Sequence, residues 1–211
     1  MAPTNLASVS TPNSSAEHWT FIRAAIRRPQ LIGAVAPSTR GLGEQLAAIV
    51  PQRGTPTVVE LGPGTGPVSA IIRQRMPSGG RQLAVEIDMN MVDYLRRRHP
   101  WLTVLPGDAA ALDTLLADAD VRRVDAVVSG LPWSIFPLPR QERMLGSICQ
   151  VLNPGGAFTT FGYLHARRMS GARRFHELLE RRFEEVVVTR AVWSNLPPAL
   201  VYVCRRAVPH A

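Results

Sequence analysis

The stretch Glu60–Gly66, "ELGPGTG", constrains the fold of this chain more than any other feature. It follows a continuous apolar segment at 57–61 and opens a helical pattern at 67–75. Glycines let the backbone turn sharply and let a ligand approach closely, as at the ligand-binding edge of doubly wound α/β sheets. The third glycine comes one residue too early for a dinucleotide fingerprint, and a chain without lysine cannot carry a P-loop.

Strand and helix patterns alternate from Thr57 onward. The apolar runs of the strands are continuous, as expected when helices cover both faces of a sheet. We therefore expect an α/β fold with a Rossmann-like, doubly wound, mostly parallel seven-stranded sheet and an antiparallel C-terminal hairpin at its edge. The predicted strands are 57–61, 82–87, 102–105, 124–128, 157–161, 184–193 and 199–205, and the helices between them are 67–75, 89–98, 111–118, 140–152 and 171–182.

The remainder of the chain predicts a simple domain organisation. Its 211 residues suffice for one α/β domain, which we place at 56–211. Residues 16–55 predict two N-terminal helices that form a possible membrane or substrate lid, the second capped by Ser38. Residues 1–15 lack a basic start and an apolar run, so we expect a flexible tail and no signal peptide.

Charge and cysteine content narrow the functional classes. The net charge is +8, and every basic side chain apart from histidine is arginine. Such an excess favours anionic partners such as phospholipid head groups or nucleic acid, although a basic surface without a function is the alternative. Cys149 and Cys204 lie far apart, so they predict reduced thiols of a cytoplasmic protein and no metal site.

Two acidic residues make the interpretation of the glycine turn more specific. Glu86 ends the second predicted strand, and Asp108 follows the third. With the E-x-G-x-G-x-G turn, these residues resemble the class I S-adenosylmethionine-dependent methyltransferases. The resemblance implies S-adenosylmethionine as cofactor, with Glu86 on its ribose, Asp108 on its adenine amine and Glu60 near its methionine end. The full set of expected cofactor neighbours is Glu60, Gly62, Gly64, Thr65, Gly66, Glu86, Ile87, Asp108, Ala109 and Ser129.

The segment after the fourth strand, Gly130-Leu131-Pro132-Trp133, concerns the substrate. Ribosomal RNA adenine dimethylases carry Asn-(Leu/Ile)-Pro-(Tyr/Phe) at this place, where the asparagine and the next carbonyl accept the amine protons. Leu131 and Pro132 match that pattern, and Trp133 offers a ring for stacking. Gly130 lacks the acceptor, a loss of roughly 1 kcal/mol or more in a dry pocket, which weighs against adenine. A turn with a buried tryptophan is the alternative for Trp133.

Four segments resemble the bacterial phospholipid N-methyltransferases. They are "GAVAPS" at 33–38, "SGLP" at 129–132, "FGY" at 161–163 and "WSNLPPA" at 193–199. The resemblance implies methylation of phosphatidylethanolamine toward phosphatidylcholine. It names Tyr163 and Leu131 as catalytic, with Tyr163 orienting or deprotonating the amine, and it names Gly130, Trp133, Trp193 and Asn195 as substrate-binding. A core role for Tyr163 is the alternative, and His165 is a second candidate base.

The chain departs from that family at the aromatic segment. The family reads Phe-Thr-Tyr followed by glycine, whereas this chain has Phe161-Gly162-Tyr163-Leu164. The proline-rich run that follows in the family is replaced here by "LHARRMSGARR" at 164–174. The four arginines of that segment predict phosphate contacts or, alternatively, a solvated loop.

Residues 16–28, "AEHWTFIRAAIRR", predict a basic amphipathic helix that binds an anionic membrane surface. Each arginine near such a surface contributes about 1 kcal/mol to the free energy of membrane binding. A helix that covers the sheet edge with solvated arginines is the alternative. The resulting expectation is a cytoplasmic enzyme, peripheral on the inner face of the membrane.

The function expected from these residues is N-methylation of phosphatidylethanolamine or a related lipid amine. One rival is an RNA base methyltransferase, which explains the charge by phosphate contacts but lacks the asparagine and an appended RNA-binding domain. Others are a small-molecule methyltransferase and a membrane-bound binding protein that retains the cofactor fold. Nothing in the sequence fixes the oligomeric state.

Overall fold

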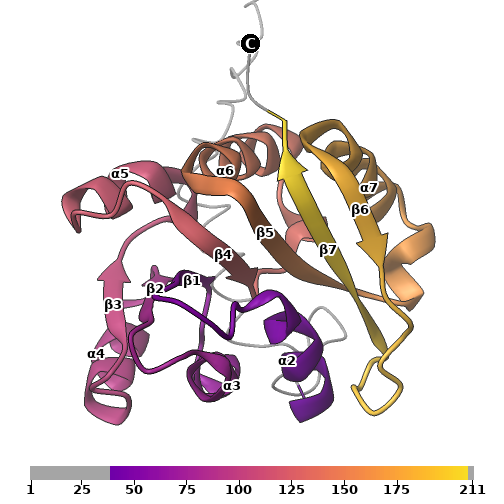
Figure 1. The fold of residues 1–211 in the computed structure, drawn as a ribbon. Coiled ribbons are helices and arrows are strands. Elements are labelled where there is room, and N and C mark those ends of the chain that lie inside the picture. The colour runs from indigo at the N-terminus through magenta and orange to yellow at the C-terminus, as the bar shows by residue number, and fades with distance from the viewer. Residues whose placement is uncertain (1–38, 209–211) are drawn as a thin grey trace, which may run out of the picture. The chain divides into compact units, whose positions relative to one another are not determined.

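A computed structural model describes residues 39–208 and shows a seven-stranded sheet of order β3-β2-β1-β4-β5-β7-β6 (Figure 1). The first five strands are parallel, whereas β7 is antiparallel to both β5 and β6. This arrangement confirms the predicted sheet and its antiparallel C-terminal hairpin. The strands are β1 (Thr57–Leu61), β2 (Arg81–Glu86), β3 (Thr103–Pro106), β4 (Val124–Ser129), β5 (Leu152–Tyr163), β6 (Phe183–Val188) and β7 (Ala199–Ala207).

Helices cover both faces of the sheet, which explains the continuous apolar character of the central strands. One face carries α2 (Arg40–Leu46), α3 (Pro67–Arg75) and α4 (Met89–Arg98), and the other carries α5 (Leu112–Asp118), α6 (Leu138–Val151) and α7 (Ser170–Arg182) (Figure 1). Four short 3₁₀ turns complete the described part: η2 (Ala47–Ile49), η3 (Ala109–Ala111), η4 (Trp133–Ile135) and η5 (His165–Arg168).

The core on the α2 and α3 face shows how the sequence pattern becomes packing. Leu42 and Leu46 of α2 and Ile72 of α3 are buried against Val58 of β1 and Val201 of β7. Each apolar side chain removed from water in this way stabilises the fold by roughly 1.5–3 kcal/mol. These apolar side chains of α2 and α3 therefore pack both helices against one face of the sheet.

Several predicted boundaries were wrong within the described residues, and β5 begins at Leu152 rather than at residue 157. Thr39 is the N-cap of α2, because its Oγ1 accepts a hydrogen bond from the Leu42 amide at 3.5 Å, so the cap lies one residue after Ser38. Strand β6 ends at Val188 rather than at residue 193, and Val192 pairs with Ala199 only as an isolated bridge. The predictions for 1–15, for 16–28 and for the 33–38 segment lie outside the described residues.

The parallel strands place their carboxyl ends at one edge of the sheet. The turn after β1 therefore meets the residues that follow β2, β3, β4 and β5. Strand β7 begins at this same edge, with Ala199 opposite Tyr163 at the end of β5. The 189–198 connection between β6 and β7, which we call the tip, thus reaches the edge where ligands bind in α/β sheets.

Candidate active site

The glycine turn after β1 is built from residues with positive φ angles. Gly62, Gly64 and Gly66 have φ values of 68°, 57° and 87°. A Cβ atom on Gly62 would lie 2.5 Å from Cδ2 of Leu131, and one on Gly66 would lie 2.6 Å from Nε2 of His99. A Cβ on Gly64 would have no heavy atom within 4 Å beyond those of Gly64 and the two residues next to it in the chain. A side chain on Gly62 or Gly66 would therefore displace Leu131 or His99, whereas Gly64 borders open space above the turn.

Glu60 lies beneath this turn in the protein interior, with 1% of its surface exposed. The Ser69 hydroxyl of α3 donates a hydrogen bond to its Oε2, and Gln82 in turn donates to the Ser69 carbonyl at 3.0 Å. Burial raises the pKa of Glu60 to about 7, against the opposing effect of the Ser69 hydrogen bond, and the nearby Glu86 raises it further. The carboxyl group is therefore positioned by α3 and titrates near neutral pH.

Glu86, at the end of β2, is held by its own backbone. Its Oε1 accepts hydrogen bonds from the amides of Ile87 and Asp88, both at 2.9 Å. Burial raises the pKa of Glu86, while these amides and that of Gly64 lower it. Asp88 caps α4 by accepting from the Asn90 amide at 3.0 Å. The carboxylate thus has a fixed orientation beside the glycine turn, and Ile87 contributes its amide to that orientation.

Asp108 follows β3 and is fixed by two partners. Its Oδ1 accepts a hydrogen bond from the Ala110 amide at 2.9 Å and forms a 2.6 Å ion pair with Nη2 of Arg140. Ala109 begins η3 directly after this acid. Arg140 lies in the first turn of α6, and its guanidinium also lies 5.5 Å from the ring centroid of Phe136. The sequence analysis did not identify Arg140, because its contact with Asp108 spans 32 residues.

The turn after β4 is held rigidly by side-chain hydrogen bonds. Ser129 Oγ accepts from the Trp133 indole at 2.9 Å and from the Leu131 amide at 3.3 Å. Gln141 of α6 donates to the carbonyls of Trp133 and Phe136 at 2.8 and 3.0 Å. The Ser129 side chain is thus occupied inside the turn instead of being directed at the cofactor.

Trp133 anchors the turn in the core. Its side chain is 1% exposed and stacks on Phe175 with ring centroids 4.9 Å apart. The rings of Phe136 and Phe158 meet it edge-on at 6.3 and 5.8 Å. No free ring face is left for a planar base, so the structure gives Trp133 the alternative role of a buried tryptophan that borders the pocket described below.

Gly130 is where the turns after β4 and β1 meet. Its amide donates to the Leu61 carbonyl at 2.8 Å, and a Cβ at this position would lie 2.9 Å from the Gly62 carbonyl oxygen. A side chain at residue 130 would therefore push the two turns apart. The Leu131 carbonyl accepts the Trp133 amide at 3.0 Å and keeps a second lone pair. The glycine in place of asparagine is thus a packing requirement of this fold.

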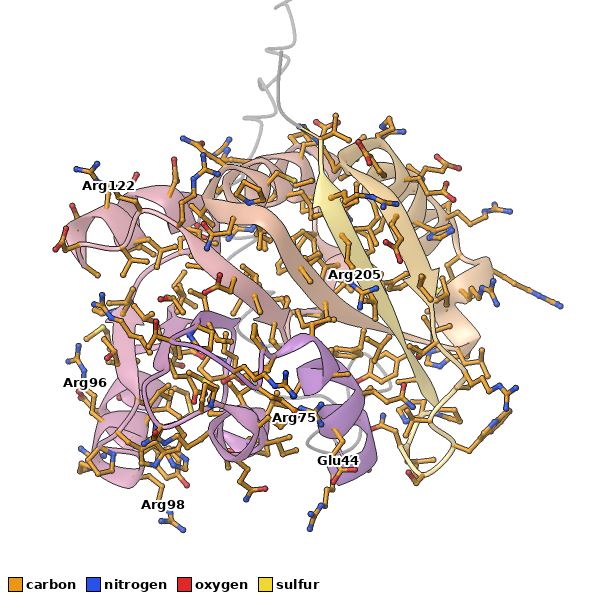
Figure 2. All side chains as sticks on the ribbon, in the orientation of Figure 1. Glu44, Arg75, Arg96, Arg98, Arg122 and Arg205 are labelled. Carbon is orange, nitrogen blue, oxygen red and sulfur yellow. The ribbon has the colours of Figure 1, made fainter. Side chains whose placement is uncertain are left out.

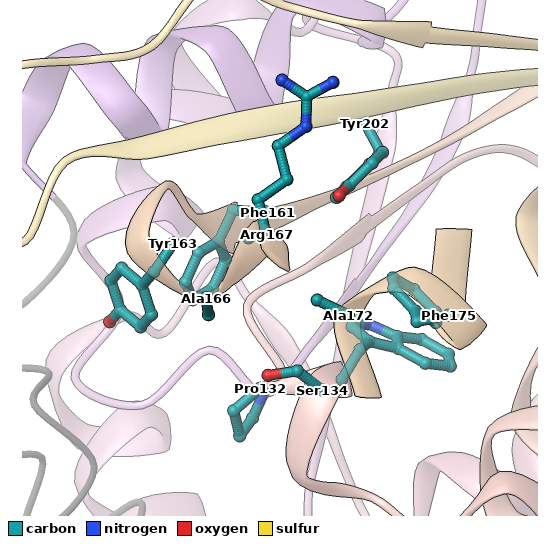
Figure 3. Close-up of a pocket in the computed structure, with 11 residues that line it drawn as sticks. Pro132, Ser134, Phe161, Tyr163, Ala166, Arg167, Ala172, Phe175 and Tyr202 are labelled. Carbon is teal, nitrogen blue, oxygen red and sulfur yellow. The ribbon is translucent and has the colours of Figure 1, made fainter. Parts of the chain in front are cut away.

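A pocket of about 440 Å³, part of it open to solvent, lies on the substrate side of this turn (Figure 3). Tyr202 of β7 forms one wall, and Gly162 leaves room for it, because a Cβ there would lie 3.2 Å from the Tyr202 ring. Of the described lining residues, only Arg167 is charged. The lining consists of Pro132, Trp133, Ser134, Phe161, Gly162, Tyr163, Ala166, Arg167, Ala172, Phe175 and Tyr202.

Tyr163 contributes a half-buried phenol to this pocket. Its ring meets Phe161 edge-on at 5.4 Å and stacks on His165 at 5.7 Å. Burial raises the pKa of Tyr163, so the phenol stays protonated at neutral pH. Its hydroxyl points away from the Arg167 guanidinium (Figure 3). A protonated phenol can donate one hydrogen bond and accept others.

The predicted substrate residues of the tip lie elsewhere. Trp193 is 73% exposed and is not part of the pocket lining. Asn195 is buried, its Oδ1 accepts from the Thr39 amide at 3.1 Å, and its Nδ2 donates to the Pro197 carbonyl at 2.8 Å. The Asn195 side chain therefore ties the tip to the start of α2, and it is not part of the pocket lining.

Within residues 39–208 there is no cluster of His, Cys, Asp and Glu side chains suited to a metal ion. None of the helices in the same range is long and apolar enough to cross a membrane.

Comparison with known proteins identifies the family. A methyltransferase-domain family model matches residues 58–156. The ornithine lipid N-methyltransferase of Singulisphaera acidiphila is 30% identical over 192 residues, which cover 90% of this chain and 96% of that protein. The chain belongs to the S-adenosylmethionine-dependent methyltransferases.

More distant relatives share part of this methyltransferase or its fold. The ribosomal RNA small subunit methyltransferase A of Thiobacillus denitrificans is 39% identical over 90 residues, covering 42% of this chain but 32% of that protein. A TehB-like S-adenosylmethionine-dependent methyltransferase from Corynebacterium glutamicum has a TM-score of 0.59 at 18% identity, covering 92% and 99% of the two chains. An O-methyltransferase from Bacillus cereus, solved with S-adenosylhomocysteine, has a TM-score of 0.63 at 15% identity, covering 88% and 90%.

The residues at the edge of this methyltransferase fit its cofactor, S-adenosylmethionine. The open space above Gly64 admits a ligand against the backbone, and Glu86 presents a carboxylate in a fixed orientation beside it. Carboxylates at the end of the second strand suit ribose hydroxyls.

Proposed function

We propose that this methyltransferase transfers a methyl group to the amine of a membrane amino lipid. The observation that carries the proposal is the match to an ornithine lipid N-methyltransferase along nearly the whole of both chains. Phosphatidylethanolamine, the substrate expected from the sequence, and an ornithine lipid both present an amine close to an anionic group. The shared chemistry of the substrate is thus a lipid head group with one amine and one anion.

The pocket suits such a head group. Its aromatic walls accept methylated ammonium groups through cation–π attraction. Arg167 supplies the only charge among the described lining residues, and a guanidinium pairs with phosphate or carboxylate oxygens. In this proposal Arg167 binds the head-group anion at one end of the pocket, and the amine lies toward Tyr163 at the other.

Methyl transfer requires the amine to arrive neutral and in line with the methyl group that the cofactor supplies. We propose that the Tyr163 hydroxyl and the Leu131 carbonyl accept hydrogen bonds from the amine and orient its lone pair. The proton lost from the ammonium form passes to water. In this proposal the turn at 130–133 is held rigid by Ser129 and Gln141, so its Leu131 carbonyl is in place before the amine arrives.

Several observations count against an adenine substrate. The match to the ribosomal RNA methyltransferase of Thiobacillus denitrificans covers 32% of that protein. Gly130 has no acceptor side chain and no space for one, and Trp133 is covered by Phe175. Ribosomal RNA is therefore included in the experiment below for comparison and is not proposed as a substrate.

The experiment incubates the full chain with methyl-labelled S-adenosylmethionine and, separately, phosphatidylethanolamine vesicles, ornithine-lipid vesicles, ribosomal RNA and a panel of small amines. We expect label in an amino lipid, and the two vesicle arms distinguish phosphatidylethanolamine from an ornithine lipid. Mass spectrometry of the product locates the methyl group on nitrogen. Label only in RNA or only in small amines contradicts the proposal.

A further inference from the structure

The tip carries the most exposed large apolar side chains among the described residues. Trp193 is 73% exposed and Leu196 is 65% exposed. Met169, 62% exposed, lies between η5 and α7, and the Leu164 amide just before η5 donates to the Pro198 carbonyl of the tip at 2.8 Å. We call Trp193, Leu196 and Met169 the apolar rim. Exposed large apolar side chains on neighbouring segments are candidates for an interaction site.

The tip is a built structure, because its backbone is fixed on both sides. Val192 and Ala199 exchange hydrogen bonds of 2.6 and 3.4 Å across its base. Asn195 binds the Thr39 amide and the Pro197 carbonyl, as described above. Trp193 and Leu196 are therefore exposed on a loop whose backbone and Asn195 side chain are held by hydrogen bonds.

The charge around the rim selects the kind of partner. Residues 161–176 and 186–199 contain five arginines and no aspartate or glutamate. Arg168 and Arg190, close in sequence to the rim residues, are exposed. Arginines near an anionic bilayer contribute about 1 kcal/mol each. Helix α2, which contacts the tip through Gln45 and Thr189, adds the exposed pair Arg40 and Glu44, so the charge around the rim stays net positive. Apolar side chains in a net positive surrounding fit an anionic lipid surface.

The pocket lies next to these same segments. Tyr163, Ala166 and Arg167, which line it, belong to the end of β5 and to η5. A bilayer that accepts the rim in its head-group region therefore has its head groups at the level of the pocket. Tryptophan favours this interfacial depth, because its ring is amphipathic.

We propose that the apolar rim inserts into the head-group region of an anionic bilayer and brings lipid head groups to the pocket. This inference rests on the proposed function, since it assumes a substrate that stays in the membrane. It gives Trp193 a role in membrane contact instead of the head-group binding that the sequence predicted.

The test measures flotation of the full chain with vesicles of phosphatidylcholine, with and without about a third of phosphatidylglycerol. We expect the double variant Trp193→Ala/Leu196→Ser to partition at least about tenfold more weakly than the wild type. Val208→Ala is the matched control, because Val208 is 38% exposed but lies at the opposite end of β7. Equal partition of the double variant and the wild type overturns the inference.

Two single arginine variants test the electrostatic contribution to membrane binding. Arg190→Ala is expected to weaken binding to the anionic vesicles about fivefold. Arg122→Ala, which changes an exposed arginine between α5 and β4 at the other edge, is expected to leave it unchanged (Figure 2). Equal effects of the two variants show a dependence on net charge alone and contradict the rim as the docking surface.

A soluble substrate distinguishes failure of this inference from failure of the proposed function. We expect the double variant to methylate a short-chain amino lipid below its micelle concentration at the wild-type rate while losing turnover on vesicles. Loss of turnover on the monomeric lipid places Trp193 in the substrate site and overturns the inference. Failure of the wild type itself on every amino lipid overturns the proposed function, whatever the flotation result. If the double variant floats like the wild type but has a different molecular mass in light scattering, the rim is instead a contact between two copies of the chain.

Discussion

The two sides of the ligand-binding edge differ in chemistry and in how they are packed. On the cofactor side, Glu60, Glu86 and Asp108 bring carboxyl groups to the ends of three successive strands. On the pocket side the described lining is aromatic, with Arg167 as its charge. The cofactor carries cationic groups and hydroxyls, whereas the proposed head group carries an anion beside its amine. The contrast indicates that each side is charged to suit a different ligand.

The turn at 130–133 is the boundary between the two sides. Gly130 packs on the Gly62 carbonyl of the cofactor side, whereas Trp133 stacks on Phe175 of the pocket side. Because one short turn contacts both sides, a change in it affects both ligands. Substitutions on either side alone are expected to affect one ligand only.

The largest expected effect is a difference in the free energy of unfolding between substitutions of Gly62 and Gly64, two glycines of the cofactor side. Gly62→Ala forces a positive φ on alanine and drives Cβ against Leu131, so we expect a loss of about 2–5 kcal/mol in the free energy of unfolding. Gly64→Ala meets only the φ penalty, and we expect a loss of about 1–2 kcal/mol. Urea unfolding measures both, and an equal loss in the two variants shows that the contact with Leu131 is unimportant.

A second prediction uses the pH dependence of Glu60. Burial raises its pKa to about 7 in the folded state, above its ordinary value of 4.5, so the folded protein binds more protons between these values. Stability of the cofactor-free protein is therefore expected to fall from pH 5 to pH 8, by on the order of 2 kcal/mol through this group. Glu60→Gln removes that contribution. Urea unfolding at the two pH values compares them, and an identical decrease in both proteins contradicts the buried titration.

The smallest effect tests whether the two sides act separately. Glu86→Gln is expected to weaken S-adenosylmethionine binding about tenfold in calorimetry and to leave KM for the amino lipid unchanged. Tyr163→Phe keeps the ring but removes the hydroxyl, so we expect a several-fold to about tenfold lower kcat with unchanged cofactor affinity. A change of both parameters in either variant breaks the proposed division of the edge.

Local patterns predicted the cofactor side of the fold well. The helices α3 and α4 begin and end at the predicted residues, because caps and glycines act within a few positions. Strand β6 was predicted five residues too long, since the apolar pattern continues to Trp193 while pairing stops at Val188. Pattern alone does not distinguish an apolar residue that pairs in a sheet from one that is exposed on a loop.

The pocket side depended on contacts between distant segments, which no local pattern contains. Tyr202 enters the pocket because Gly162 on the neighbouring strand leaves space for its ring. Asn195 is buried because it binds Thr39, which lies 156 residues away. The fate of Trp133 depended on Phe158 and Phe175, two rings that reach it from β5 and α7. Residue type singled out Trp133 and Asn195 but not Tyr202, and only packing decides which of these side chains line the pocket.

The hydrogen bond between Asn195 and the Thr39 amide has a consequence for avidity. It fixes the point at which the chain enters the described domain, directly beside the tip that carries the apolar rim. Residues 16–28, predicted to bind an anionic membrane, are joined to this point by about ten residues, which span at most roughly 40 Å. Where both segments bind lipid as proposed, so short a connection would give the second contact a high effective concentration, and each contact could remain weak enough for release.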